Sequence, residues 1–256
     1  MNPLSRHYYE VIPEYQPCKL YFDIEYNVEL NERINGDEML EKFKNVLIGD
    51  LQNTFGSKTI CTNEHIIDLC SNTLTKFSHH IIVNHHELIF ANNYHVGRYV
   101  KYLCHKLKNA PEMQIVLNKK FAAERKTNCP DANDTMHGTF IDEGVYTKNR
   151  NFRIYLSSKF NKTACLKLPK NAFNLSDECI FLNSLVTNVC KQYKYHSQNN
   201  VNEQQRKYIT FEYEDPLLPG VVALTDFKPA MTSIANRTRF KNRYLVLELY
   251  KFSVIS

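Results

Sequence analysis

The segment from 19 to 26 alternates strictly between two kinds of side chain. Such a period of two is typical of a β-strand, because successive side chains point to opposite faces of a sheet. The strand therefore needs apolar cover on one face and presents polar groups on the other. The two sets are Leu20, Phe22 and Ile24 on the apolar face, and Tyr21, Asp23 and Glu25 on the opposite face.

The rest of the chain predicts an α+β fold in which strands and helices follow one another. We expect helices over 37–55, with Asp37 as N-cap and Gly56 as stop, over 95–107, and from Ser176 to about Lys191. Further strands are expected over 75–83, 114–117 and, as a pair joined by a Lys148-Asn149 turn, 139–146 and 150–157. The range 126–138 reads as an exposed loop, 193–205 as a linker, and 244–249 as a strand-like run.

Composition excludes several classes of protein. The sequence has no apolar run long enough to span a bilayer, so we predict no membrane association. Its 8 cysteines are scattered singly, without a CxxC pair, and its first ten residues lack a signal-peptide core. Free thiols and the absent signal favour an intracellular protein. The net charge of +5 permits a polyanionic partner without requiring one.

Polar side chains of the 75–83 strand share one parity. Lys76, Ser78 and His80 place an ammonium, a hydroxyl and an imidazole on one face, and this donor set suits phosphate oxygens. The alternative is an ordinary polar sheet face. Cysteine and histidine elsewhere match no zinc spacing, so we assign them to structural roles and expect no zinc.

Carboxylates provide the second half of the same hypothesis. Two acids two residues apart on a strand lie about 7 Å from each other and are able to share hard cations. Asp142, at the end of a short apolar run, is a candidate third ligand, and Asp23, Glu25 and Asp142 together predict a catalytic metal site. The alternative is a solvated strand face and a turn residue.

Basic residues follow the third carboxylate along the chain. Arg150, Arg153 and Lys159 are candidates for nucleotide or template phosphates, and alternatively they are exposed charges of a hairpin.

In their order and amino-acid identity, these segments and their flanks resemble those of the eukaryotic primase-polymerases of the archaeo-eukaryotic primase superfamily. The resemblance covers about 7–190. The matching segments are Tyr9–Glu14, Cys18–Glu25, Lys76–His80, His95–Gly97, Gly144–Arg153, Ser157–Lys159 and Ser184–Val189.

This resemblance implies an archaeo-eukaryotic primase catalytic core over 1–192, with a palm sheet like that of RNA-recognition motifs and packed helices. Residues 193–256 would form a linker and a C-terminal segment of unknown role. It implies that Asp23, Glu25 and Asp142 hold a pair of Mg²⁺ or Mn²⁺ ions. It assigns nucleotide binding to the basic and hydroxyl residues named above, and sugar selection to Tyr9.

The implied activity is nucleotidyl transfer from (d)NTPs on a single-stranded or primed DNA template, in replication restart and damage tolerance. The implied location is the nucleus or mitochondrion, with a single-strand-binding protein as a candidate partner. The last cysteine is Cys190 and the last histidine His196, so the sequence lacks the family's C-terminal zinc knuckle. A catalytically impaired single-strand-binding remnant and a metal-dependent nuclease remain as alternatives.

Overall fold

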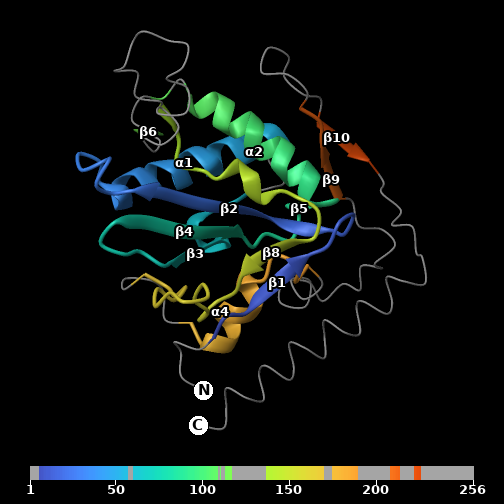
Figure 1. Cartoon of the computed structure of the whole chain (residues 1–256). Coiled ribbons are helices and arrows are strands. Elements are labelled where there is room, and N and C mark those ends of the chain that lie inside the picture. The colour runs from blue at the N-terminus through green and yellow to red at the C-terminus, as the bar shows by residue number, and fades with distance from the viewer. Residues whose placement is uncertain are drawn as a thin grey trace, which may run out of the picture.

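The computed structural model describes residues 6–56, 60–108, 110, 113–116, 137–169, 175–189, 208–213 and 222–225. They form a mixed α+β arrangement (Figure 1). The helices are α1 (Gly36–Phe55), α2 (Asn93–Leu107) and α4 (Asp177–Ser184), and short 3-10 turns span Asn63–His65 and Glu143–Val145. The strands are β1 (Tyr9–Ile12), β2 (Cys18–Asn27), β3 (Ile66–Cys70), β4 (Lys76–Val83), β5 (Ile89–Phe90), β6 (Gln114–Val116), β7 (His137–Thr139), β8 (Arg150–Arg153), β9 (Tyr208–Phe211) and β10 (Val222–Thr225).

Most strands join one six-stranded sheet in the order β10-β9-β5-β2-β4-β3. Strand β2 pairs antiparallel with β4 along Leu20–Asn27 and with β5 at Cys18 and Lys19. The pairing of β5 with β9 is parallel, so the sheet is mixed. Two smaller ribbons, β1-β8 and β6-β7, complete the strand pairing. The predicted α+β class is confirmed.

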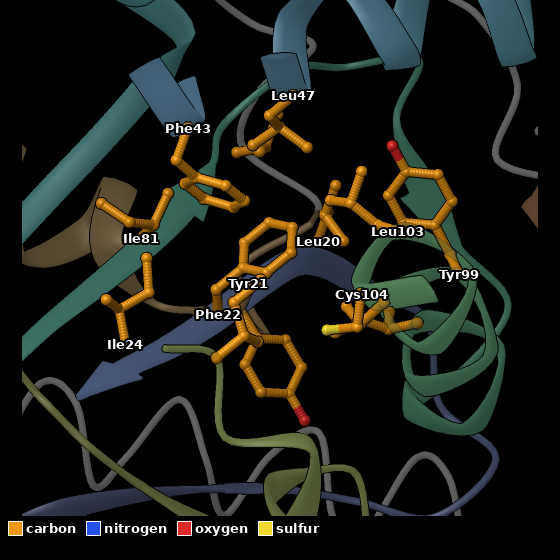
Figure 2. Close-up of a cluster of buried hydrophobic side chains, with 14 of the residues drawn as sticks. Leu20, Tyr21, Phe22, Ile24, Phe43, Leu47, Ile81, Tyr99, Leu103 and Cys104 are labelled. Atoms are coloured by element: carbon orange, nitrogen blue, oxygen red, sulfur yellow. The ribbon is translucent and has the colours of Figure 1, made fainter. Parts of the chain in front are cut away.

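Helices α1 and α2 cover one face of the sheet, and the β1-β8 ribbon with α4 lies on the other side (Figure 1). The apolar set predicted for β2 is fully buried. The Phe22 ring meets Phe43 of α1 edge-on, with ring centroids 5.3 Å apart (Figure 2). Edge-to-face contacts of this kind add to the hydrophobic gain from burying each ring.

Helix boundaries follow side-chain caps. The predicted Asp37 cap is wrong, because the N-cap of α1 is Asn35, whose side chain accepts a hydrogen bond from the Glu38 backbone N–H. Gly56 ends the helix as predicted, with a φ of 88° that a residue with a Cβ rarely adopts. Helix α2 begins slightly before the predicted residue 95, with Asn92 as its cap.

Helix α4 begins as predicted, because Ser176 accepts a hydrogen bond from the Cys179 N–H, but it ends at Ser184 rather than near Lys191. The reason is a tertiary contact. The partly buried Glu10 carboxylate of β1 accepts hydrogen bonds from the backbone N–H groups of Val186 and Thr187, at 2.9 and 3.0 Å. These donors are therefore satisfied outside the helix.

The predicted hairpin of 139–146 with 150–157 is wrong. Strand β8 pairs instead with β1, which matches Tyr9 with Arg153 and Ile12 with Arg150. Within the first expected strand the chain turns at Asp142, whose side chain caps a 3-10 turn by accepting from the Gly144 N–H at 2.8 Å. A capped turn in the middle of an expected strand stops its pairing.

Several predicted segments lie outside the described residues: 126–136 of the expected loop, the 193–205 linker and the strand-like run 244–249. Strand β9 comes from beyond residue 192, yet it belongs to the main sheet. The division at 192 stays a prediction. Of the helices in the described ranges, none combines the length and apolar character needed to cross a bilayer.

Gly97 allows α2 to approach the turn that follows Asp142. A Cβ built at Gly97 would lie 2.7 Å from the Tyr146 Cβ, whereas a Cβ at Gly49 in α1 meets nothing within 4 Å. Tyr146 in turn donates a hydrogen bond from its hydroxyl to the Tyr21 carbonyl at 2.8 Å. The glycine thus sets the spacing between the helix layer and the loop beside the carboxylates.

We expect Gly97→Ala to destabilise the protein by about 1–3 kcal/mol through overpacking. The matched variant Gly49→Ala should instead stabilise by about 0.5–1 kcal/mol, because alanine favours a helix interior. Urea unfolding of both variants measures the difference. Equal effects of the two substitutions would contradict the assigned role of Gly97.

Candidate metal and phosphate site

The register between β2 and β4 gathers both predicted polar sets on one sheet face. Asp23 lies opposite His80, Glu25 opposite Ser78, and Asn27 opposite Lys76. Directly opposite residues of an antiparallel pair point to the same face. The carboxylates of β2 and the donors of β4 therefore lie side by side. The pattern of each strand alone does not determine this pairing.

Asp142 reaches the same place through the other edge of β2. Ile141 forms an antiparallel bridge with Ile24. The Asp142 N–H donates to the Asp23 carbonyl at 2.8 Å, and the Glu25 N–H donates to the Phe140 carbonyl at 2.8 Å. The backbone thus brings Asp142 beside Asp23 across the strand edge, although the two residues are far apart in sequence.

The cluster is electrostatically costly in the absence of a cation. The pKa of Asp23 rises from 3.8 to about 6, first because the carboxyl is buried and then because Glu25 and Asp142 are negatively charged. Lys76 forms an ion pair with Glu25. In the described part of the chain, no three His, Cys, Asp or Glu side chains are arranged to hold a metal ion together. The carboxylates converge on one face without forming a complete ligand set.

His80 is a neutral group at this face. Burial lowers its pKa well below the usual 6.5, and the charges of Arg153 and Lys159 lower it further. Its Nε2 lies 3.8 Å from the Asp23 Oδ1, and its ring stacks on Phe152 of β8 with centroids 4.1 Å apart. The stacking fixes the imidazole plane beside the carboxylates.

Arg153 is connected to β4 through Ser71. Its Nη2 donates to the Ser71 hydroxyl at 2.9 Å, and that hydroxyl lies 3.2 Å from the Ser78 hydroxyl. Arg153 is buried, and its Nη1 donates to the Ala164 carbonyl at 3.2 Å. This arrangement ties the β1-β8 ribbon to the end of β4 that bears the predicted phosphate donors.

Several buried nitrogens of the predicted nucleotide-binding set lack a hydrogen-bond partner within the described residues. They are His80 Nδ1, Arg150 Nε and Arg153 Nε. Buried polar atoms are usually satisfied, so each of these nitrogens is a point at which a ligand would supply the missing partner. An anion with several acceptor oxygens fits this set.

Tyr9 and Lys159 lie at the rim. Tyr9 is opposite Arg153 in the β1-β8 ribbon, and 39% of its surface is exposed. Lys159 is exposed, and its charge lowers the pKa of both Asp23 and His80. The individual roles of the predicted site residues stay predictions.

Sequence reasoning missed residues that position the site. Ser71 bridges Arg153 and Ser78, and nothing local distinguishes this serine from an ordinary turn residue. Glu10 holds the chain after α4; burial raises the pKa of its carboxyl, and the charge of the nearby, fully buried Lys19 acts in the opposite direction. An acidic residue within an otherwise hydrophobic strand was the available signal.

Fold and geometry together define a class of site: carboxylates on a mixed sheet, bordered by arginine, lysine and histidine donors. Such sites suit divalent cations and phosphate groups. No family model matches the chain. It is 37% identical over 207 residues to the DNA-directed primase/polymerase protein of Danio rerio. The matched region covers 72% of this chain and 39% of that protein.

Other relatives carry the same name. The Homo sapiens protein is 31% identical over 240 residues and the Mus musculus protein 32% over 222 residues, each covering 72% of this chain. The chain spans about two fifths of the length of these relatives. The chain is homologous to the eukaryotic primase-polymerases, and the resemblance read from its motifs is confirmed.

Burial, and after it the charges of Glu25 and Asp142, make the ionised Asp23 unfavourable, so Asp23→Asn should stabilise the metal-free protein at pH 8. Between pH 3.8 and about pH 6, Asp23 binds more protons in the folded protein than in the unfolded chain. In this range Asp23 therefore makes the free energy of unfolding fall as the pH rises. Above this pH range the carboxylate is fully ionised and destabilises the protein by its full amount. Removing its charge should then raise the free energy of unfolding by about 1–3 kcal/mol. Near pH 4 the gain should vanish.

Urea unfolding in the presence of EDTA measures this difference. Glu32→Gln, which changes an exposed acid, serves as control and should be neutral at both pH values. A gain for Asp23→Asn that is independent of pH would argue against a raised pKa of Asp23 in the folded protein.

Proposed function

We propose that this chain contains the catalytic core of a DNA-directed primase/polymerase. The reaction would be metal-dependent nucleotidyl transfer from (d)NTPs onto a primer or an initiating nucleotide on single-stranded DNA. The observation that supports it most is the position of Asp142, hydrogen-bonded to the Asp23 backbone on the face that also bears His80 and Ser78. The names of the relatives support the same activity.

Divalent cations fit the donor set. Asp23, Glu25 and Asp142 would hold Mg²⁺ or Mn²⁺, because carboxylate oxygens are the ligands that these ions prefer. Bound there, the cations would assist deprotonation of a 3′-hydroxyl and stabilise the leaving pyrophosphate. Engagement of Glu25 by a cation would release Lys76 from its ion pair, and its ammonium would then be available to phosphate oxygens.

The remaining residues would bind and orient the nucleotide. Ser78 and neutral His80 would donate to the triphosphate, and Arg150, Arg153 and Lys159 would neutralise charge that grows during in-line attack. The orphaned nitrogens of His80, Arg150 and Arg153 support this assignment. Tyr9, exposed on β1, would pack against the sugar.

We extend the proposal to the primase-type palm over 1–192 and to a role in replication restart and damage tolerance. It includes a single-strand-binding protein as partner and residence in the nucleus or mitochondrion. The names of the relatives and the six-stranded sheet with helices on one face are consistent with this architecture.

The alternative is a single-strand-binding remnant without catalysis. It is favoured by one observation, that no complete metal-ligand set exists among the described residues. Binding without incorporation would identify it, whereas shortening of labelled DNA would identify a nuclease.

Primer extension with Mn²⁺ tests the proposal. The wild type should lengthen a labelled primer, and Asp23→Ala with Glu25→Ala should lower the rate by about 10²-fold or more, since charge stabilisation in the transition state is lost. Glu29→Ala with Glu32→Ala removes two exposed acids and should leave extension unchanged. Equal extension by wild type and the Asp23/Glu25 variant would refute the assignment.

A further inference from the structure

A tight turn on the predicted nucleotide-binding side presents an aromatic ring to solvent. The Lys162 N–H donates to the Lys159 carbonyl at 2.9 Å, and Asn161 adopts a positive φ of 58°. Phe160, inside this turn, is 73% exposed, which makes it the most exposed aromatic side chain in the described ranges. Single exposed apolar groups are common, so exposure alone does not indicate binding, and the surroundings of the ring have to be considered.

The turn is held firmly at its base. Leu156 and Leu166 are joined by a backbone hydrogen bond of 2.8 Å, and Ser158 bridges to Cys165. The Ser158 N–H also donates to the Arg6 carbonyl at 2.8 Å. A loop fixed by these bonds loses little additional conformational entropy when a ligand binds.

The Phe160 ring itself has a neighbour. The His7 ring meets it at 74° with centroids 5.5 Å apart. His7 is in turn fixed by its Nδ1, which lies 3.2 Å from both the hydroxyl and the carbonyl oxygen of Ser158. The edge contact orients the phenyl ring while most of its surface stays open.

Charge around the ring suits a polyanion. Lys159 and Lys162 flank Phe160, both are exposed, and neither forms an ion pair with another described residue. Arg153 of the predicted nucleotide-binding set donates a hydrogen bond to the Ala164 carbonyl at 3.2 Å, so the loop that carries this turn lies against that set. An aromatic ring set between cations is the arrangement that binds single strands, with stacked bases and neutralised phosphates.

The other highly exposed aromatic ring lacks this setting. Tyr15 is 66% exposed, but it follows Glu14, whose carboxylate binds Lys148 at 2.8 Å. That pair leaves no excess positive charge beside the ring. Phe160 therefore stands apart by its flanking lysines as well as by its exposure.

We propose that Phe160 stacks on a base of the single-stranded DNA at the entrance of the site, with Lys162 against an adjacent phosphate. The inference rests on the proposed function, since it requires a DNA substrate, and it adds a contact for that substrate outside the carboxylate face. It concerns the DNA strand and not the incoming nucleotide.

The sequence contains no tryptophan, so Phe160→Trp introduces a single indole at the proposed contact. Titration with an unstructured oligothymidylate should quench its fluorescence through base stacking. The matched control is Val46→Trp, at an exposed position of α1 on the opposite side of the sheet, and it should not respond. Quenching by dGTP with Mn²⁺ but not by the oligonucleotide would overturn the proposal.

Affinity measurements by fluorescence anisotropy separate stacking from simple apolar contact. Phe160→Ala and Phe160→Leu should each weaken oligonucleotide binding about tenfold, since both lack a π face, whereas Phe160→Trp should bind as well as wild type. Lys162→Ala should reduce the salt dependence of binding by about one phosphate contact. Wild-type affinity in the leucine variant would refute stacking.

Primer extension by the wild type distinguishes the two levels of the argument. If the wild type extends primers while Trp at position 160 gives no quenching, the stacking inference fails and the proposed function stands. If the wild type neither binds the oligonucleotide nor extends primers, the proposed function fails and the inference fails with it.

Discussion

Backbone hydrogen bonds along both edges of β2 determine where the charged groups of the site lie. On one edge the antiparallel register with β4 sets His80 against Asp23 and Ser78 against Glu25. On the other edge, the bridge between Ile24 and Ile141 brings in Asp142. A shift of one residue on either edge would turn these side chains to the helix-covered face, so the register is a condition for the whole site.

The energy that maintains this arrangement comes from elsewhere in the molecule. Mutually repelling carboxylates and buried arginine nitrogens without partners are unfavourable locally. They persist because α1 and α2 bury the opposite face of β2, and because Glu10 and the Gly97–Tyr146 contact fix the flanking loops. Local cost supported by a rigid surrounding structure is typical of functional sites.

The proposed reaction and the proposed DNA contact use different parts of this frame. Carboxylates of the sheet would hold cations, the donors of β4 and β8 would bind the triphosphate, and the 159–162 turn would contact the single strand. The names of the relatives support the activity to which the first two assignments belong. The third assignment is supported by the exposure of the Phe160 ring and the charge of the lysines beside it.

Local pattern in the sequence determined which residues share a face. The alternation around Asp23 and Glu25, and that around Ser78 and His80, predicted the two polar sets, because parity depends only on the geometry of an extended chain. The Ser176 cap and the Gly56 stop were readable for a similar reason, since a side chain or a positive φ acts within a few residues.

Only the tertiary structure decided which faces meet. The expected hairpin does not form because β8 pairs with β1. Helix α4 ends early because the next backbone N–H groups donate to Glu10. Strand partners and registers depend on contacts between residues far apart in sequence, and a local pattern does not encode these. Asp142 was predicted from its type and neighbours, but its place beside Asp23 required the fold.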